Sequence, residues 1–133
     1  LFLGEKIGEG ASREVYEFKF DKEYVIKIES SYKFFQNALE WKVWNEVEGT
    51  NMEKWFAPCH TISSCGLYLI QRRCSHLSKK EYPKKIPSIF TDTKYENFGM
   101  LDGRFVCMDY GTFNVVGSSR SLTKAEWWTG KTE

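Results

Sequence analysis

The alternation of apolar and polar residues predicts three β-strands within residues 1–29. VYEFKF at 15–20 and YVIKIE at 24–29 alternate along their length, which is typical of half-buried strands. LFLGEKIG at 1–8 alternates only in part. Between the first two strands, GEGASRE is a loop of small residues with two glycines. The chain is therefore expected to begin with short strands joined by tight loops.

Beyond residue 31 the apolar residues recur at steps of three and four, which predicts an amphipathic helix. These residues are Phe35, Leu39, Val43, Trp44 and Val47. Ser30 or Ser31 can cap the start of the helix, because a serine hydroxyl accepts a hydrogen bond from a free backbone N–H. Gly49 can end it, since glycine adopts the left-handed conformation easily.

Two shorter strands are predicted after the helix. They are HTISS at 60–64 and LYLIQRR at 67–73. A polar and basic connector with Pro83 and Pro87 then occupies residues 74–88, with room for one turn of helix.

A further hairpin is predicted around Asp102-Gly103. The segments at 98–101 and 104–108 are apolar, and an Asp-Gly pair between them favours a tight two-residue turn. Near the end, AEWW at 125–128 carries two large rings. We expect these rings to cover the core, whereas an exposed pair would indicate a partner surface.

The composition describes an ordinary globular chain. It has 133 residues, 41% hydrophobic, 28% charged and a net charge of +1. This predicts one domain or two closely packed lobes, and it favours neither a membrane nor specific nucleic acid as a partner. The lysine-rich segment SKKEYPKK at 78–85 is interpreted as a solvated loop, with an anion or acidic-partner site as the alternative.

The four cysteines, Cys59, Cys65, Cys74 and Cys107, form no CxxC pair and no compact disulfide framework. We therefore expect reduced thiols and a cytoplasmic protein. Zinc binding by the first three, together with His60 and His76, is a weak alternative because no zinc-knuckle spacing is present.

A second set of residues points to phosphate chemistry. Gly8 and Gly10 lie in a turn between two strands, where the missing Cβ lets the backbone approach a phosphate. Lys27 lies in the middle of a strand and can point toward the same place. Glu40 lies at the edge of the predicted apolar helix face and is the favoured ion-pair partner of Lys27, with Glu46 as the alternative.

A third set surrounds the predicted Asp-Gly hairpin. The segment TDTKYENFGMLDGRFVCMDYGT, residues 91–112, contains an Asp-x-Lys-x-x-Asn run before the hairpin and Asp-Tyr-Gly after it. A hairpin brings the two ends of its strands together, so Asn97 and Asp109 are expected to lie at adjacent strand ends.

Taken in this order, the motifs resemble those of the protein-kinase-like superfamily over roughly residues 1–112. The resemblance implies an α+β fold, with a five-stranded antiparallel N-lobe sheet, one helix and a much reduced C-lobe. It implies a nucleotide-binding part at 1–74 and a rudimentary C-lobe at 75–133. In its economy the chain is similar to small phage-encoded kinase-like proteins.

The resemblance also implies a role for each residue of the third set. Asp92 would position the acceptor hydroxyl and take its proton. Lys94 would neutralise charge on the transferred phosphoryl group. Asn97 and Asp109 would bind Mg²⁺.

The nucleotide, ATP, would be held by the first set. The resemblance implies that Gly8 and Gly10 cover the phosphates, and that Lys27 holds two of them with the helix glutamate as its partner. The backbone of the strand and hinge at Gln71 and Arg73 would face the adenine.

The chain departs from the family pattern at several positions. Arg13 replaces the third glycine of the loop, so the phosphates are cradled more loosely or the arginine adds charge. Phe90 and Thr91 replace the His-Arg before Asp92, which argues against regulation by a phosphorylated activation loop. Tyr110 replaces a phenylalanine, a mild change. Residues 75–91 are too few for the family's long scaffold helix, and we expect no peptide-gripping lobe within residues 112–133.

Two functions follow as expectations. The first is an ATP- and Mg²⁺-dependent kinase of the Ser/Thr protein kinase type, with a protein or a small molecule as phosphoacceptor. The second is a kinase-shaped pseudoenzyme that binds or inhibits a host or cellular protein. An unrelated small α+β domain is the third interpretation.

Overall fold

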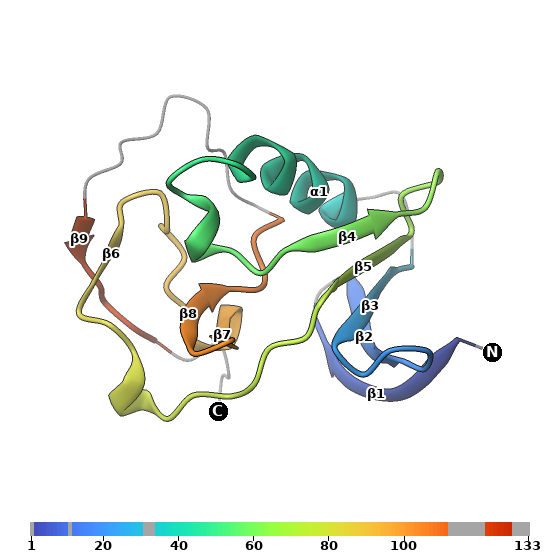
Figure 1. The fold of residues 1–133 in the computed structure, drawn as a ribbon, viewed down its shortest axis with the longest axis horizontal. Helices are drawn as coiled ribbons and strands as arrows, with labels where there is room; N and C mark the ends of the chain where they lie inside the picture. The colour runs from blue at the N-terminus through green and yellow to red at the C-terminus, as the bar shows by residue number, and fades with distance from the viewer. Residues whose placement is uncertain (1, 11, 31–33, 112–121, 129–133) are drawn as a thin grey trace.

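A five-stranded antiparallel sheet and one α-helix dominate the computed structural model, which describes residues 2–10, 12–30, 34–111 and 122–128 (Figure 1). The strands lie in the order β1-β2-β3-β5-β4. They are β1 (Leu3–Glu9), β2 (Arg13–Phe18), β3 (Tyr24–Glu29), β4 (Cys59–Ile62) and β5 (Tyr68–Arg72). The fold class is therefore α+β, as the sequence predicts.

Strand β3 lies in the middle of the sheet, between β2 and β5. Val25, Ile26 and Lys27 are all buried, so both faces of this strand are covered. The strand predicted at 24–29 is confirmed. The strand predicted at 15–20 instead spans 13–18, because the residues after it turn back toward β3, where the N–H of Tyr24 donates to the carbonyl of Asp21 at 3.1 Å.

Helix α1 (Gln36–Val47) packs against β3, β4 and β5 (Figure 1). Its predicted end is confirmed, since Gly49 follows with a φ of 81°. Its predicted serine cap is wrong for Ser30, because the helix begins only at Gln36, whereas Ser31 lies outside the described residues. The helix starts late because a carboxylate from β3 binds its first free amides.

The buried face of α1 is more polar than predicted. Val43, Trp44 and Val47 are buried, as the spacing predicts. Phe35 and Leu39 are instead 52% and 40% exposed. Two polar residues, described with the candidate site below, occupy the buried side of the first turns.

The second half of the chain contains two small sheets of two strands each. They pair β7 (Phe98–Leu101) with β8 (Arg104–Cys107), and β6 (Lys85–Pro87) with β9 (Leu122–Lys124). The predicted hairpin turn is confirmed, since Asp102 and Gly103 have φ angles of 51° and 78°, which a turn of this kind requires. Nothing in the sequence predicted the β6–β9 pair, because strands this short carry too little periodicity.

Three 3₁₀-helices connect these elements. They are η1 (Glu53–Trp55), η2 (Lys79–Glu81) and η3 (Tyr95–Asn97). The turn of helix expected in the basic connector is η2. In its capping box, the N–H of Ser78 donates to the carboxylate of Glu81 at 2.9 Å.

An aromatic core joins the two halves of the chain. Phe56 packs edge-on against Tyr110, with ring centroids 4.9 Å apart. Trp127 packs against Phe98 at 5.0 Å. The expectation that the last two tryptophans cover the core holds for Trp127 only, because Trp128 is 48% exposed.

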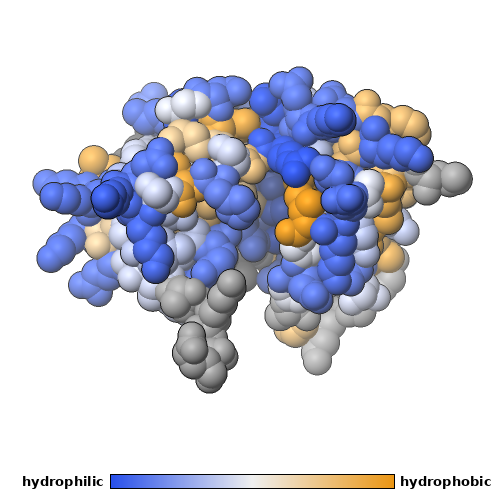
Figure 2. Space-filling model, turned by 90° about the horizontal axis from the view of Figure 1, so that it is seen from below, coloured by the Kyte–Doolittle hydropathy of each residue, from blue (hydrophilic) through white to orange (hydrophobic). Residues whose placement is uncertain are grey.

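Seen from below, the surface is hollowed between two masses, and hydrophilic residues occupy much of it (Figure 2). The right-hand mass corresponds to the side of β1 and β2 in Figure 1, and the left-hand mass to the side of the two small sheets. Among the described residues, no helix is long and apolar enough to cross a membrane.

Candidate active site

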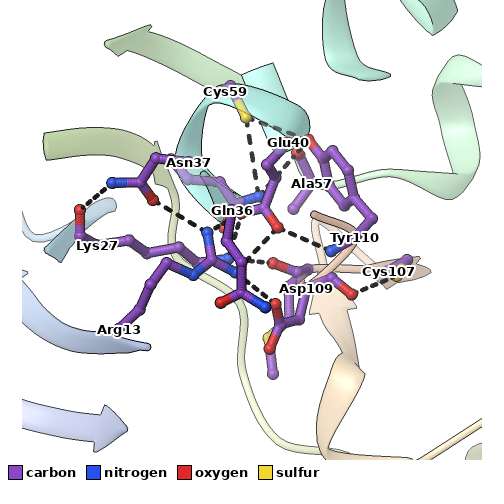
Figure 3. Close-up of polar contacts among 12 residues, drawn as sticks. Arg13, Lys27, Gln36, Asn37, Glu40, Ala57, Cys59, Cys107, Asp109 and Tyr110 are labelled. Carbon is purple, nitrogen blue, oxygen red and sulfur yellow. Dashed lines mark hydrogen bonds and ion pairs between the residues drawn. The ribbon is translucent and has the colours of Figure 1, made fainter. Parts of the chain in front are cut away.

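The centre of the candidate site is the carboxylate of Glu40, which is fully buried and accepts four hydrogen bonds (Figure 3). Its Oε1 accepts from Lys27 Nζ at 2.6 Å and from an Arg13 terminal nitrogen at 3.1 Å. Its Oε2 accepts from the other Arg13 terminal nitrogen at 3.1 Å and from the N–H of Tyr110 at 2.8 Å. The two oxygens of a carboxylate have about four acceptor sites, so this group is saturated.

This surrounding keeps Glu40 ionised. Burial by itself would raise the pKa of its carboxyl group, but the positive charges of Arg13 and Lys27 and their hydrogen bonds outweigh it and lower the pKa to about 2. Burial would likewise lower the pKa of Arg13, and the charges of Glu40 and Asp109 raise it instead. Glu40 and Arg13 therefore both carry their charge at neutral pH.

The favoured partner of Lys27 is the one that the structure shows. The ion pair Lys27–Glu40 is buried on both sides, with side-chain exposures of 6% and 0%. The alternative, Glu46, lies exposed on the same helix. Lys27 itself is buried in the middle of β3.

The capping of α1 explains why Glu40 points into the site. Both oxygens of Glu29, at the end of β3, accept backbone N–H groups at the start of the helix, from Gln36 at 2.8 Å and from Asn37 at 2.9 Å. The amide of Asn37 donates to the carbonyl of Lys27 at 3.1 Å. A negative charge at a helix N-terminus is favourable, and it fixes Glu40, one turn later, beside Lys27.

Arg13 is the residue whose role the sequence did not reveal. It begins β2, and its side chain is only 5% exposed. One terminal nitrogen donates to Asn37 Oδ1 at 3.0 Å and to Glu40, and the other donates to Glu40 and to Asp109 Oδ1 at 2.5 Å. Of the two alternatives for Arg13, looser cradling of phosphates stays a prediction, and its charge forms a buried bridge between α1 and the end of the β7–β8 hairpin.

The hairpin brings Asn97 and Asp109 together, as predicted. The carbonyl of Asn97 accepts hydrogen bonds from the N–H groups of Met108 and Asp109, at 2.8 Å and 3.2 Å. Lys27 Nζ donates to the carbonyl of Met108 at 2.5 Å, which ties the same hairpin to β3. The side chain of Asp109 is 48% exposed, so its carboxylate is accessible from outside the buried cluster.

In the described part of the chain, Asp92 and Lys94 are not bonded directly to this cluster. They occupy the loop before η3, where the N–H of Lys94 approaches Asp92 Oδ1 at 3.4 Å. Lys94 Nζ lies 5.8 Å from the centre of the Trp128 ring. Within the described part of the chain, no hydrogen bond or ion pair joins either residue to Lys27, Glu40 or Asp109.

The prediction that both glycines lie in a turn is wrong for Gly8, which lies within β1 opposite Val15, whereas Gly10 follows that strand. The fold requires glycine at neither position. Neither Gly8 nor Gly10 has a positive φ, unlike the three glycines at turns. A Cβ added to Gly10 would meet no atom within 4 Å, and one added to Gly8 would come no closer than 3.9 Å, to Val15. Packing does not explain these glycines, and the space beside them is open.

Gln71 and Arg73, the residues predicted to face the adenine, both donate hydrogen bonds to other parts of the protein. Gln71 lies in β5 between β3 and β4, and its buried amide donates to the carbonyl of Ala57 at 3.4 Å. The N–H of Arg73 donates to the carbonyl of Glu23 at 2.8 Å. Their adenine contacts stay a prediction, and Arg73 would have to release Glu23 to donate one.

The tyrosine at position 110, where the family has phenylalanine, has a buried hydrogen-bond partner for its hydroxyl group. That hydroxyl donates to the carbonyl of Ala57 at 2.6 Å and contacts the sulfur of Cys59 at 3.2 Å. Burial raises the pKa of Tyr110 well above its ordinary value. The tyrosine hydroxyl thus ties the Asp-Tyr-Gly segment to the residues before β4.

The residues present fit magnesium better than zinc. No three His, Cys, Asp or Glu side chains come together to hold a metal in the described ranges, which include all the cysteines and histidines. Mg²⁺ needs fewer protein ligands, because it keeps several waters and is bound by one or two oxygen groups together with substrate phosphates. The half-exposed carboxylate of Asp109 beside Asn97 meets that requirement.

No model of a known protein family matches this chain, and no curated protein matches it. The chemistry of the site therefore rests on its own geometry.

Proposed function

We propose that this chain is an ATP- and Mg²⁺-dependent phosphotransferase of the protein-kinase-like class. The observation that carries the proposal is the buried ion pair between Lys27 and Glu40, next to Asp109 at the end of the hairpin. Burying two charges costs free energy that only close attraction and further hydrogen bonds offset, and perturbed charged groups cluster at functional sites. Phosphoryl transfer uses them, because its catalysis is mainly positioning and neutralisation of charge.

The nucleotide phosphates are assigned to the space beside Gly8 and Gly10. Neither packing nor backbone conformation requires glycine at these two positions. A glycine at each is explained if the backbone approaches a phosphate closely there. Lys27 would hold two of the phosphates while Glu40 fixes the ammonium group.

The metal ion is assigned to Asn97 and Asp109. Bound there with the nucleotide, Mg²⁺ would supply charge neutralisation between the phosphates. The hairpin contributes by holding the two residues in register through the carbonyl of Asn97.

Asp92 and Lys94 keep the roles that the resemblance implies. Asp92 would accept the proton of the acceptor hydroxyl, and Lys94 would lie near the transferred group. Both residues lie in the loop before η3, whose last residue, Asn97, accepts backbone hydrogen bonds from Met108 and Asp109, so the acceptor would enter next to this loop.

The acceptor is a protein or a small molecule with an alcohol group. A protein acceptor would need a docking surface outside the site. The exposed lysines of the connector, Lys79, Lys80, Lys84 and Lys85, form no ion pair within the described part of the chain and suit an acidic segment.

A label-transfer experiment tests the proposal. Purified protein is incubated with labelled ATP and Mg²⁺, alone and with cell lysate, beside Asp109→Asn. The matched control is Asp102→Asn, the same change at an exposed position of the same hairpin. We expect Asp109→Asn to abolish transfer, Asp92→Asn to slow it by roughly a hundred- to ten-thousand-fold, and Asp102→Asn to leave it unchanged. Equal transfer by wild type and Asp109→Asn would refute the kinase.

The second candidate is a binding module without catalysis. It is favoured by one observation, the ion pair that Arg13 makes with Asp109, which occupies the metal-binding carboxylate. Thermal unfolding separates the two candidates. ATP with Mg²⁺ at about a hundred times the dissociation constant stabilises a binding protein by roughly 2.7 kcal/mol, whereas a module that binds no nucleotide shows no shift.

A further inference from the structure

One nitrogen of Arg13 is shared between two carboxylates. It donates to Glu40 Oε2 at 3.1 Å and to Asp109 Oδ1 at 2.5 Å, while the other terminal nitrogen donates to Asn37 and Glu40 (Figure 3). All four terminal N–H groups of the guanidinium are thus used. Three of the four stay on helix α1, and one reaches Asp109.

The charges of the cluster are balanced in this arrangement. Arg13 and Lys27 are positive, and Glu40 and Asp109 are negative. A divalent cation on the Asp109 carboxylate would lie next to the guanidinium that donates to Oδ1, and two neighbouring positive groups repel each other. The cation and Arg13 therefore compete for Asp109.

The two carboxylates differ in their freedom to change partners. Glu40 is fully buried and saturated by Lys27, Arg13 and the N–H of Tyr110. Asp109 is 48% exposed, and Arg13 is the one ion-pair partner it has within the described part of the chain. Exchange is consequently confined to Asp109, and Arg13 keeps its contacts to α1 when the exchange occurs.

We propose that Arg13 is a positioning residue that holds Asp109 next to the Lys27–Glu40 pair in the cation-free protein and is displaced from Asp109 by the divalent cation. This inference rests on the proposed function, because it assigns the cation to Asp109. The N–H released from Asp109 would then be available to donate to a phosphate oxygen of the nucleotide. Cation binding and nucleotide binding are then coupled through one arginine.

Mn²⁺ is the probe, since the free ion gives a spectroscopic signal that is lost on binding. Its dissociation constant is measured without nucleotide for the wild type and for Arg13→Gln, Lys27→Gln and Asp109→Asn. Lys27→Gln is the matched control, because it removes the same charge from the same Glu40 without removing a hydrogen bond to Asp109. Circular dichroism checks that each variant is folded.

We expect Arg13→Gln to bind Mn²⁺ roughly ten- to a hundredfold more tightly than the wild type. The reason is that Mn²⁺ no longer has to break the charge-assisted hydrogen bond between Arg13 and Asp109. Lys27→Gln changes the affinity much less, and Asp109→Asn abolishes binding. Arg13→Lys replaces Arg13→Gln in the experiment if the latter does not fold. Lysine keeps the positive charge but lacks the two terminal nitrogens with which the guanidinium bridges Glu40 and Asp109. The Arg13→Lys variant is expected to bind more tightly than the wild type and less tightly than Arg13→Gln.

Two outcomes overturn the inference and are distinguishable. If the folded Arg13 variants bind Mn²⁺ no more tightly than the wild type, while ATP with Mg²⁺ still stabilises the wild type, Arg13 does not compete and the proposed function survives. If no form binds Mn²⁺ and ATP with Mg²⁺ gives no thermal shift, the inference and the proposed function fail together.

Discussion

Replacing Glu40 by glutamine removes the negative charge on which two buried cations depend. In the folded protein the pKa of Glu40 is about 2, below the ordinary glutamate value of 4.5. At about 1.4 kcal/mol for each pH unit, the folded state prefers the charged carboxyl group by about 3 kcal/mol. Breaking a buried ion pair by removing one partner is of similar size, about 3–5 kcal/mol. We therefore expect Glu40→Gln to lower the free energy of unfolding by about 3 kcal/mol near neutral pH.

The effect should depend on pH in one direction. Because the pKa of Glu40 is lowered on folding, its contribution is complete above the unfolded-state pKa of about 4.5 and is lost as the pH falls toward 2. The difference between the wild type and Glu40→Gln should therefore shrink to about half near pH 3.

Urea unfolding, followed by circular dichroism near pH 7 and near pH 3, measures both effects. Glu46→Gln is the control, since it makes the same change at an exposed position of the same helix and should alter stability by less than about 0.5 kcal/mol. The reasoning would be wrong if the two variants were equally stable near pH 7, or if their difference did not decrease in acid.

Two further predictions concern packing. Gly111→Ala should destabilise the protein by about 1–3 kcal/mol, because the added Cβ would lie 2.7 Å from the carbonyl oxygen of Gln36, whereas Gly10→Ala, which meets no atom within 4 Å, should leave the melting temperature unchanged. Trp127→Ala should cost about 3 kcal/mol because its ring packs in the aromatic core, whereas Trp128→Ala, at a 48% exposed position, should cost less than about 1 kcal/mol. Thermal melts measure both pairs, and equal effects within either pair would contradict the packing described.

Local pattern was sufficient for several elements. Alternation predicted β3, and the step of three and four predicted the buried side of α1 at Val43, Trp44 and Val47. The residue pair Asp102-Gly103 predicted the hairpin turn, and the positive φ angles of both residues confirm it. These features depend on neighbours a few residues away, and such neighbours are visible in the sequence.

Other features depended on residues far apart. The start of α1 is set by Glu29 and not by a serine, because a buried carboxylate from β3 reaches its free amides first. The pair β6–β9 joins residues 85–87 to 122–124. The alternation of apolar and polar residues within each short segment does not reveal such a long-range pairing.

For this protein, the sequence by itself determined the approximate strands of the large sheet, the hairpin and the set of charged residues available for a site. Only the tertiary structure decided that Lys27, Glu40 and Asp109 meet, and that Arg13 joins them across 96 positions of the chain. The physical reason is that a charge is stable inside a protein only where opposite charges and donors surround it. Which partners those are depends on how the sheet, the helix and the hairpin pack together.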